Sequence, residues 1–90
     1  MISREVIITN SVGLHARPAT FFIQTANTFK SIIWVEKEKR RVNAKSLLGV
    51  LSLAVTKDTA VTIIADGIDE TQAIDSLVEL VNSGLENPNK

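Results

Sequence analysis

Clusters of β-branched and other apolar residues in four segments of the chain predict four β-strands. These segments cover residues 4–9, 31–37, 40–43 and 60–66. The first one ends at residues 10–13, whose composition is typical of a loop. Trp34 alternates with Ile33 and Val35, so we expect it to lie, together with Ile32, on a sheet face that no helix covers.

Apolar residues at helical spacing follow this loop and predict a first helix. It begins near Arg17 and runs for about three turns, with Pro18 in the first turn, where a missing N–H does no harm. A second, shorter helix is predicted over residues 46–54, with Ser46 as its N-cap. The apolar positions of the first helix are Ala19, Phe22, Ile23 and Ala26.

A third helix is predicted near the end of the chain. Asp69 is its expected N-cap, Gln72 occupies the capping-box position, and Gly84 provides the stop. Its apolar stripe consists of Ala73, Ile74, Leu77, Val78 and Val81. Residues 85–90 are expected to form a frayed tail.

The order strand, helix, strand, strand, helix, strand, helix predicts an α+β fold of one domain. We expect an open-faced two-layer sandwich, in which three helices cover one face of a four-stranded, largely antiparallel sheet. The hairpin through residues 36–39 lacks a glycine or asparagine, so its turn is expected to be longer than two residues or mildly strained. Lys57-Asp58 is expected to form the bend before the fourth strand.

Composition narrows the possible functions. Ten basic residues balance ten acidic ones, so no net positive charge favours nucleic acid or an anionic membrane. The absence of cysteine excludes a disulfide framework and a thiol nucleophile, and a single histidine is a poor start for a metal site. We therefore expect neither metal nor cofactor. The first residues lack a secretory pattern, and no stretch approaches the ~18 apolar residues of a membrane span, so a cytoplasmic protein is expected.

The segment of residues 13–20 carries the candidate chemistry. It delivers His15 to the start of a helix whose first turn holds Arg17. Unpaired N–H groups and the helix dipole favour an anion there. The same field disfavours an imidazolium, so we expect a neutral His15 whose nitrogen can attack phosphorus. Arg17 can donate to phosphoryl oxygens, and Gly13 would let a partner's backbone approach closely. Alternatively, His15 is an ordinary surface or capping residue and Arg17 a solvated charge.

The second predicted helix suggests a regulatory site and a docking surface. Ser46 caps the helix, and a phosphate added there, beside Lys45, would turn the local surface anionic. The apolar arc of this helix is too wide for one buried face, so part of it should be exposed. One side of the wheel holds Val50, Leu53 and Ala54, and the adjoining side holds Leu47, Leu48 and Leu51. The alternative is a helix sunk deep in the core.

Two segments, Gly-Leu-His-Ala-Arg-Pro-Ala at 13–19 and Val-Asn-Ala-Lys-Ser at 42–46, resemble the HPr family. These histidine-containing phosphocarriers serve the phosphoenolpyruvate:sugar phosphotransferase system, and the second segment is similar to the Gram-positive type. The resemblance covers roughly Glu5 to Val81. It implies that Enzyme I phosphorylates His15 on its pros nitrogen and that sugar-specific IIA domains receive the group. The phosphate would lie among Gly13, Ala16, Arg17 and Pro18.

The resemblance further implies regulation and partner docking. Ser46 would be phosphorylated by an HPr kinase/phosphorylase, which slows transfer and favours binding to a catabolite-control repressor. The protein would be a covalent carrier rather than a self-sufficient enzyme, with no nucleic acid bound directly and no membrane insertion. The residues implied in docking are Leu14, Thr20, Lys45, Leu47, Leu48 and Leu51.

Some features depart from the family, and other classes of protein compete with it. Val12 stands where the family has a polar residue, which leaves the hydrogen bonding around the loop open. A regulatory paralogue with glutamine instead of histidine is disfavoured because His15 is present. An RNA-binding module shares the element order up to residue 66, but residues 40–43 lack the aromatic side chains that stack on bases. A small-ligand regulatory module would bind anions at the same helix start without being phosphorylated.

Overall fold

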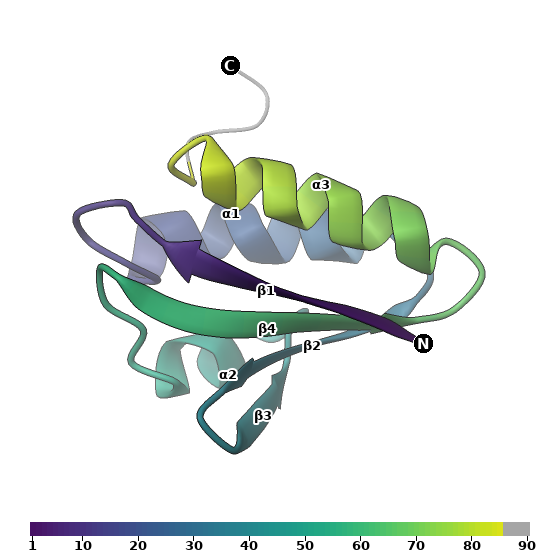
Figure 1. Ribbon diagram of the computed structural model, residues 1–90, viewed down its shortest axis with the longest axis horizontal. Helices are drawn as coiled ribbons and strands as arrows, with labels where there is room; N and C mark the ends of the chain where they lie inside the picture. Colours follow the sequence, from purple (N-terminus) through teal and green to yellow (C-terminus); the bar gives the residue numbers. More distant parts are fainter. Residues whose placement is uncertain (86–90) are drawn as a thin grey trace.

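The computed structural model describes residues 1–85 and contains the predicted order of elements (Figure 1). The sheet has the strand order β1-β4-β2-β3, and every neighbouring pair is antiparallel, so no parallel pair occurs among these residues. The first strand begins at Ile2 rather than at residue 4, and the second helix ends at Ser52 rather than at residue 54. The elements are β1 (Ile2–Ile8), α1 (Ala16–Asn27), β2 (Ile32–Lys37), β3 (Arg40–Asn43), α2 (Leu47–Ser52), β4 (Thr59–Asp66) and α3 (Glu70–Asn82).

The core lies between the sheet and the helices. Figure 1 shows α1 and α3 running over the same side of the sheet, and α2 contacts both α1 and β3. Alternate strand residues such as Ile33 and Val35 are fully buried, because their side chains point towards the helices. Ile32 and Trp34 point the other way and are 57% exposed and half-buried, respectively, as expected for the uncovered face.

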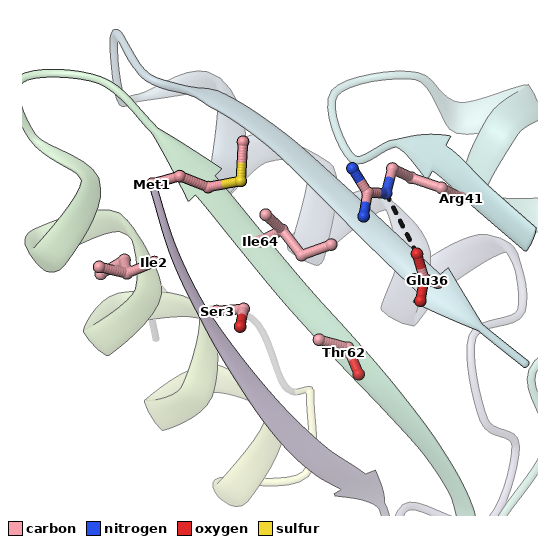
Figure 2. Close-up of a pocket in the computed structure, with 7 residues that line it drawn as sticks. All are labelled: Met1, Ile2, Ser3, Glu36, Arg41, Thr62 and Ile64. Atoms are coloured by element: carbon pink, nitrogen blue, oxygen red, sulfur yellow. Dashed lines mark hydrogen bonds and ion pairs between the residues drawn. The ribbon is translucent and has the colours of Figure 1, made fainter. Parts of the chain in front are cut away.

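The helix-free face of the sheet contains a shallow hollow of about 300 Å³ (Figure 2). Arg41 lies over the Trp34 ring, 5.7 Å from its centroid, and its Nε donates to Glu36 Oε1 at 3.1 Å. These contacts pair the charges of Arg41 and Glu36 with each other. The hollow is lined by Met1, Ile2, Ser3, Glu36, Arg41, Thr62 and Ile64, none of which is a predicted site residue.

Two tight connections are made without glycine. In the β2–β3 hairpin Lys37 pairs with Arg40, so the turn has only two residues, and Glu38 adopts a φ of 52°. The turn is therefore the short, strained alternative that the sequence left open. Asp58 has a φ of 67° at the bend before β4, where its N–H donates to Ile8 O at 2.6 Å.

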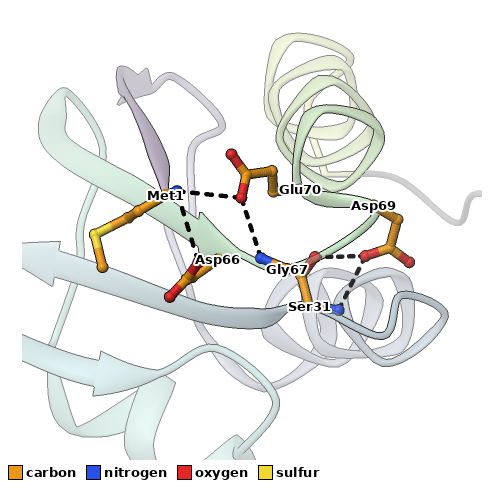
Figure 3. Close-up of polar contacts among 6 residues, drawn as sticks. All are labelled: Met1, Ser31, Asp66, Gly67, Asp69 and Glu70. Carbon is orange, nitrogen blue, oxygen red and sulfur yellow. Dashed lines mark hydrogen bonds and ion pairs between the residues drawn. The ribbon is translucent and has the colours of Figure 1, made fainter.

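A polar cluster joins the start of α3 to the segment before β2 (Figure 3). The carboxylate of Asp69 accepts hydrogen bonds from the Ser31 hydroxyl and from the N–H groups of Lys30 and Ser31. These bonds lower the pKa of Asp69 below its ordinary value, and the bond from the Ser31 hydroxyl has the largest effect. Asp69 occupies the N-cap position but makes no side-chain cap bond, which corrects the predicted cap. Its side chain fastens a distant segment instead.

Glu70, rather than Gln72, closes the loop before α3. Glu70 Oε1 accepts the Gly67 N–H at 3.1 Å and also contacts the Met1 amino group at 3.2 Å. The Gly67 bond is the main reason why the pKa of Glu70 lies below its ordinary value. Gln72 is exposed, so the predicted capping box is not formed.

The end of α3 follows the prediction, whereas the tail begins later. Gly84 has a φ of 88°, and the Leu85 N–H donates to Leu80 O at 2.9 Å, which is a Schellman end. Leu85 is only 2% exposed, so the expected frayed tail does not include it. Residues 86–90, the rest of that prediction, lie outside the described part of the chain.

No helix within residues 1–85 is both long enough and apolar enough to cross a bilayer.

Candidate functional site

The loop before α1 is a closed turn. The Gly13 N–H donates to Asn10 O at 3.2 Å, and Asn10 Nδ2 donates back to Gly13 O at 2.9 Å. Asparagine often forms such bonds between side chain and backbone in turns. Sequence reasoning treated Asn10 only as a loop residue and missed this role.

Gly13 is required by the chain itself. Its φ is 62°, and an added Cβ would lie 2.3 Å from Val55 O and 2.7 Å from Thr56 Cα. Gly13 is buried, so the close backbone approach is made by the α2–β4 connection and not by a partner, which corrects the expectation. No local sequence signal marks Val55, because it lies more than 40 residues further along the chain.

Leu14 anchors the loop in the core. Its N–H donates to Val55 O at 3.0 Å, and its side chain is only 3% exposed. A buried side chain cannot contact a partner, which corrects the expectation that Leu14 takes part in docking. The loop is thus held by hydrogen bonds on one side and by apolar burial on the other.

His15 follows directly and occupies the N-cap position of α1. Its backbone is extended (φ −81°, ψ −176°), and its C=O accepts the Ala19 N–H at 2.8 Å. The imidazole makes no cap hydrogen bond and is exposed. The structure therefore places the ring at the helix start, where it is free to react.

The first turn of α1 supplies donors for an anion. The N–H groups of Ala16 and Arg17 have no hydrogen-bond acceptor among residues 1–85, and this turn contains no acidic residue. Pro18 is half-buried and has no N–H. The Arg17 side chain is exposed and makes no ion pair with any described residue. Two amides at the start of α1 and the exposed guanidinium of Arg17, two residues after His15, are thus available to an anion.

Val12 contributes no side-chain donor to this loop. Its side chain is 52% exposed and cannot form a hydrogen bond. Asn10 Oδ1 is buried and has no partner in the part of the chain that the structure describes. The carboxamide oxygen of Asn10 is therefore the atom at which the hydrogen bonding of this loop is incomplete.

Ser46 caps α2 as predicted. Its Oγ accepts the Gly49 N–H at 3.2 Å, and its C=O accepts the Val50 N–H at 3.0 Å. The neighbouring Lys45 ammonium is turned away and donates to Phe29 O at 2.7 Å. The charge expected beside Ser46 is therefore engaged elsewhere in this structure.

The exposed side of α2 agrees with the helical-wheel argument. Leu48 is 82% exposed and Leu47 is 43% exposed, whereas Val50 is fully buried. Leu51 is half-buried against the core. The alternative of a helix sunk deep in the core is thereby excluded, and the pair Leu47 and Leu48 forms an exposed apolar surface, here called the α2 patch.

The two predicted sites lie on neighbouring helices that run in opposite directions. Asn27 at the end of α1 donates to Lys45 O at 3.4 Å before the start of α2, while Leu14 meets Val55 beyond the end of α2. Thr20, another expected docking residue, is half-buried and donates its hydroxyl to Ala16 O at 2.7 Å.

Within residues 1–85 no group of three or more acidic, histidine or cysteine side chains could hold a metal ion.

Comparison with known proteins identifies the family. The family model for the "PTS HPr component phosphorylation site" matches residues 2–83. The chain therefore belongs to the HPr family, the phosphocarriers of the phosphotransferase system. Its open, antiparallel four-stranded sheet with three helices is the HPr fold.

Individual relatives agree with this assignment. The chain is 44% identical over 82 residues to the phosphocarrier protein HPr of Neisseria meningitidis serogroup A, covering 91% of this chain and 92% of that protein. It is 46% identical over 81 residues to the HPr-like protein Crh of Bacillus subtilis, covering 90% and 95%. The crystal structure of HPr-C-His from Thermoanaerobacter tengcongensis superimposes with a TM-score of 0.93 at 48% identity, covering 94% of this chain and 96% of that one.

Proposed function

We propose that this chain accepts a phosphoryl group on Nδ1, the pros nitrogen of His15, from phosphorylated Enzyme I and donates it to sugar-specific IIA domains in the cytoplasm. The observation that carries the proposal is the exposed imidazole at the N-cap of α1, followed by two amides without an acceptor among residues 1–85 and by the exposed Arg17 side chain. The chain is a covalent carrier, and its turnover depends on its two partners. The general phosphocarrier role of the HPr family supports this proposal.

The transfer step is a substitution at phosphorus. The lone pair of His15 Nδ1 attacks, a P–N bond forms, and the bond between phosphorus and the donor breaks, so that the electron pair stays with the donor. The three phosphoryl oxygens then lie in the field of the α1 N-terminus, where the Ala16 and Arg17 N–H groups can donate to them. The reverse sequence delivers the group to an acceptor, with Arg17 balancing charge in both directions.

Partner docking uses the α2 patch, on the helix that packs against α1. Leu47 and Leu48 are the large apolar side chains that α2 leaves exposed, and exposed apolar surface of this kind favours protein–protein contact. Thr20 on α1 and Leu51 on α2 extend the docking surface as half-buried contributors. Lys45 belongs to it only if its bond to Phe29 O opens.

The direct test is the intact mass of the protein after incubation with Enzyme I and phosphoenolpyruvate. We expect the gain of one phosphoryl group, which is labile to acid because it is held by a P–N bond. His15→Ala, the matched control, should gain none. A wild-type protein whose mass does not change would remove the carrier function.

Regulation is proposed at Ser46. Its hydroxyl caps α2, so a phosphate added there would bring a charge of about −1.5 to −2 next to the docking surface. The modifying enzyme is an HPr kinase/phosphorylase, and the modified form binds a catabolite-control repressor. The test is an acid-stable phosphate introduced by ATP and the kinase and absent in Ser46→Ala. Without it, Ser46 keeps only its capping role.

A further inference from the structure

The end of α2 is held by two cations from the β2–β3 hairpin. Lys37 Nζ donates to Leu53 O at 3.0 Å and to Ala54 O at 3.2 Å. Arg40 Nη1 donates to Ser52 O at 3.0 Å. Side chains from outside the helix thus satisfy three consecutive carbonyl groups, those of its last residue, Ser52, and of the two residues that follow it. We call Lys37 and Arg40 the α2 clamp.

A helix as short as α2 needs such contacts. It has six residues, far fewer than the roughly 12 that an isolated helix requires to be even marginally stable in water. Its last carbonyl groups have no partner within the helix and carry the negative end of its dipole, where cations are favourable. The chain then turns through Ala54 with a φ of 52°, a strained conformation for a residue with a side chain.

The clamp also determines how α2 presents its exposed side. At its beginning the helix is fixed by the Ser46 cap, and along its buried side it is fixed by Val50. The clamp fixes its far end, so a rotation of α2 about its axis, which would turn Leu47 and Leu48, would break these three hydrogen bonds. The hairpin that provides the clamp holds none of the residues assigned to the His15 site.

From this arrangement we propose that Lys37 and Arg40 are positioning residues for partner docking, which hold α2 so that Leu47 and Leu48 face Enzyme I. This rests on the proposed function, in which the α2 patch docks that partner. The competing account is that the same cations act as charges that steer an acidic partner towards the molecule. The two accounts differ in what neighbouring charges should do.

Lys39 offers a matched control within the same turn. It lies between the clamp residues in sequence and carries the same charge. Its side chain is exposed and makes no hydrogen bond or ion pair with any residue in 1–85. Lys37→Met and Lys39→Met therefore remove the same charge from the same hairpin, but only the first removes bonds to α2.

The experiment measures phosphorylation by Enzyme I, with excess phosphoenolpyruvate and this protein as the varied substrate. We expect Lys37→Met and Arg40→Met each to raise KM by about fivefold or more, as the loss of a charged hydrogen bond would, with kcat within about twofold of wild type. Lys39→Met should leave both parameters within about twofold. Hydrogen exchange of the α2 amides should accelerate in the clamp variants only.

Two further variants exclude simple misfolding. Lys37→Arg keeps donors and charge at this position, so it should restore KM to nearly the wild-type value. In a Leu48→Ser background, Lys37→Met should raise KM much less than it does in the wild type, because the positioned side chain is already missing. A structural defect alone would act equally in both backgrounds.

Distinct results would overturn the proposal. A rise in KM of the same size for Lys39→Met, or an effect that disappears at high salt, would show that charge steering is the cause. Faster exchange in α2 with an unchanged KM would break the link between clamp and docking. If wild-type protein is not phosphorylated at all, the proposed function fails first and this inference with it, whereas phosphorylation with equal KM in all variants would overturn the inference alone.

Discussion

The starts of α1 and α3 have the same backbone field and opposite surroundings. Each follows a loop whose glycine, Gly13 or Gly67, has a positive φ and leaves no room for a side chain. At α3 the protein's own carboxylates occupy the region, since Glu70 accepts from Gly67 and Asp69 accepts from Ser31. At α1 the first turn has no acidic residue, and the Ala16 and Arg17 amides have no acceptor among residues 1–85. One helix start joins two segments of the fold, and the other has no acidic side chain in its first turn, as the proposed phosphate site requires.

The largest expected effect comes from His15→Ala. It removes the acceptor nitrogen, so phosphorylation by Enzyme I should be lost completely. The free energy of unfolding should change by no more than about 0.5 kcal/mol, because the imidazole is exposed and makes no cap bond. Intact mass and urea unfolding measure the two quantities. A strongly destabilised variant would mean that this helix start is structural, like that of α3.

Gly13→Ala should come next, with Gly84→Ala as its matched control. Both glycines have positive φ, but an added Cβ would strike Val55 O at position 13 and meet nothing within 4 Å at position 84. We expect a loss of about 3 kcal/mol or more in the first variant and about 1 kcal/mol in the second. Urea unfolding of the pair measures the difference. Equal losses would show that the loop can move away from Val55, and so is less rigid than the fold implies.

Arg17→Ala should slow phosphoryl transfer without unfolding the protein. Loss of a charged hydrogen bond to the phosphoryl oxygens corresponds to about 2 kcal/mol, or roughly 30-fold in kcat/KM. Stability should stay nearly constant, because Arg17 makes no ion pair among the described residues. A time course of phosphorylation by Enzyme I measures kcat/KM. A wild-type rate would exclude Arg17 from the transfer step.

Acid should lower the free energy of unfolding through the two carboxylates at the start of α3. The pKa values of Asp69 and Glu70 are lower in the folded protein than their ordinary values of 3.8 and 4.5. Their stabilisation is therefore complete above about pH 4.5 and is lost as the pH falls through the folded values, because the unfolded chain binds more protons there. Urea unfolding between neutral and acid pH measures the slope.

Ser31→Ala should reduce this acid dependence. It removes a buried hydroxyl, 1% exposed, and should lower the free energy of unfolding at neutral pH by about 1 kcal/mol. Because the hydroxyl is also the main cause of the low Asp69 pKa, the slope of stability against pH should become shallower. Transfer at His15 should be unchanged. An unchanged slope would assign the acid dependence to groups outside this cluster.

Local patterns in the sequence predict most of the fold. The strands and helices follow from the spacing of apolar residues, and the start of α2 and the end of α3 follow from single residues. Ser46 and Gly84 act as expected for this reason. Features that depend on distant segments could not be predicted in this way. Asp69 is an example, since its carboxylate meets Ser31, 38 residues away, instead of capping its own helix.

The candidate site shows the same division. His15 and Arg17 lie at the start of α1 because both belong to one short segment that begins a helix. The burial of Leu14 and the crowding at Gly13 arise from Val55, which only the folded chain brings near. Strain at Glu38 likewise depends on the register of β2 and β3, which pairs Lys37 with Arg40.

The most direct test of the account is a comparison of backbone amide spectra before and after phosphorylation of His15. Hydrogen bonds from the first turn to the phosphoryl oxygens should shift the Ala16 and Arg17 amide protons strongly downfield, while the amides at the start of α3 stay in place. Unmoved Ala16 and Arg17 signals in a fully phosphorylated sample would contradict the claim that the open start of α1 holds the phosphate.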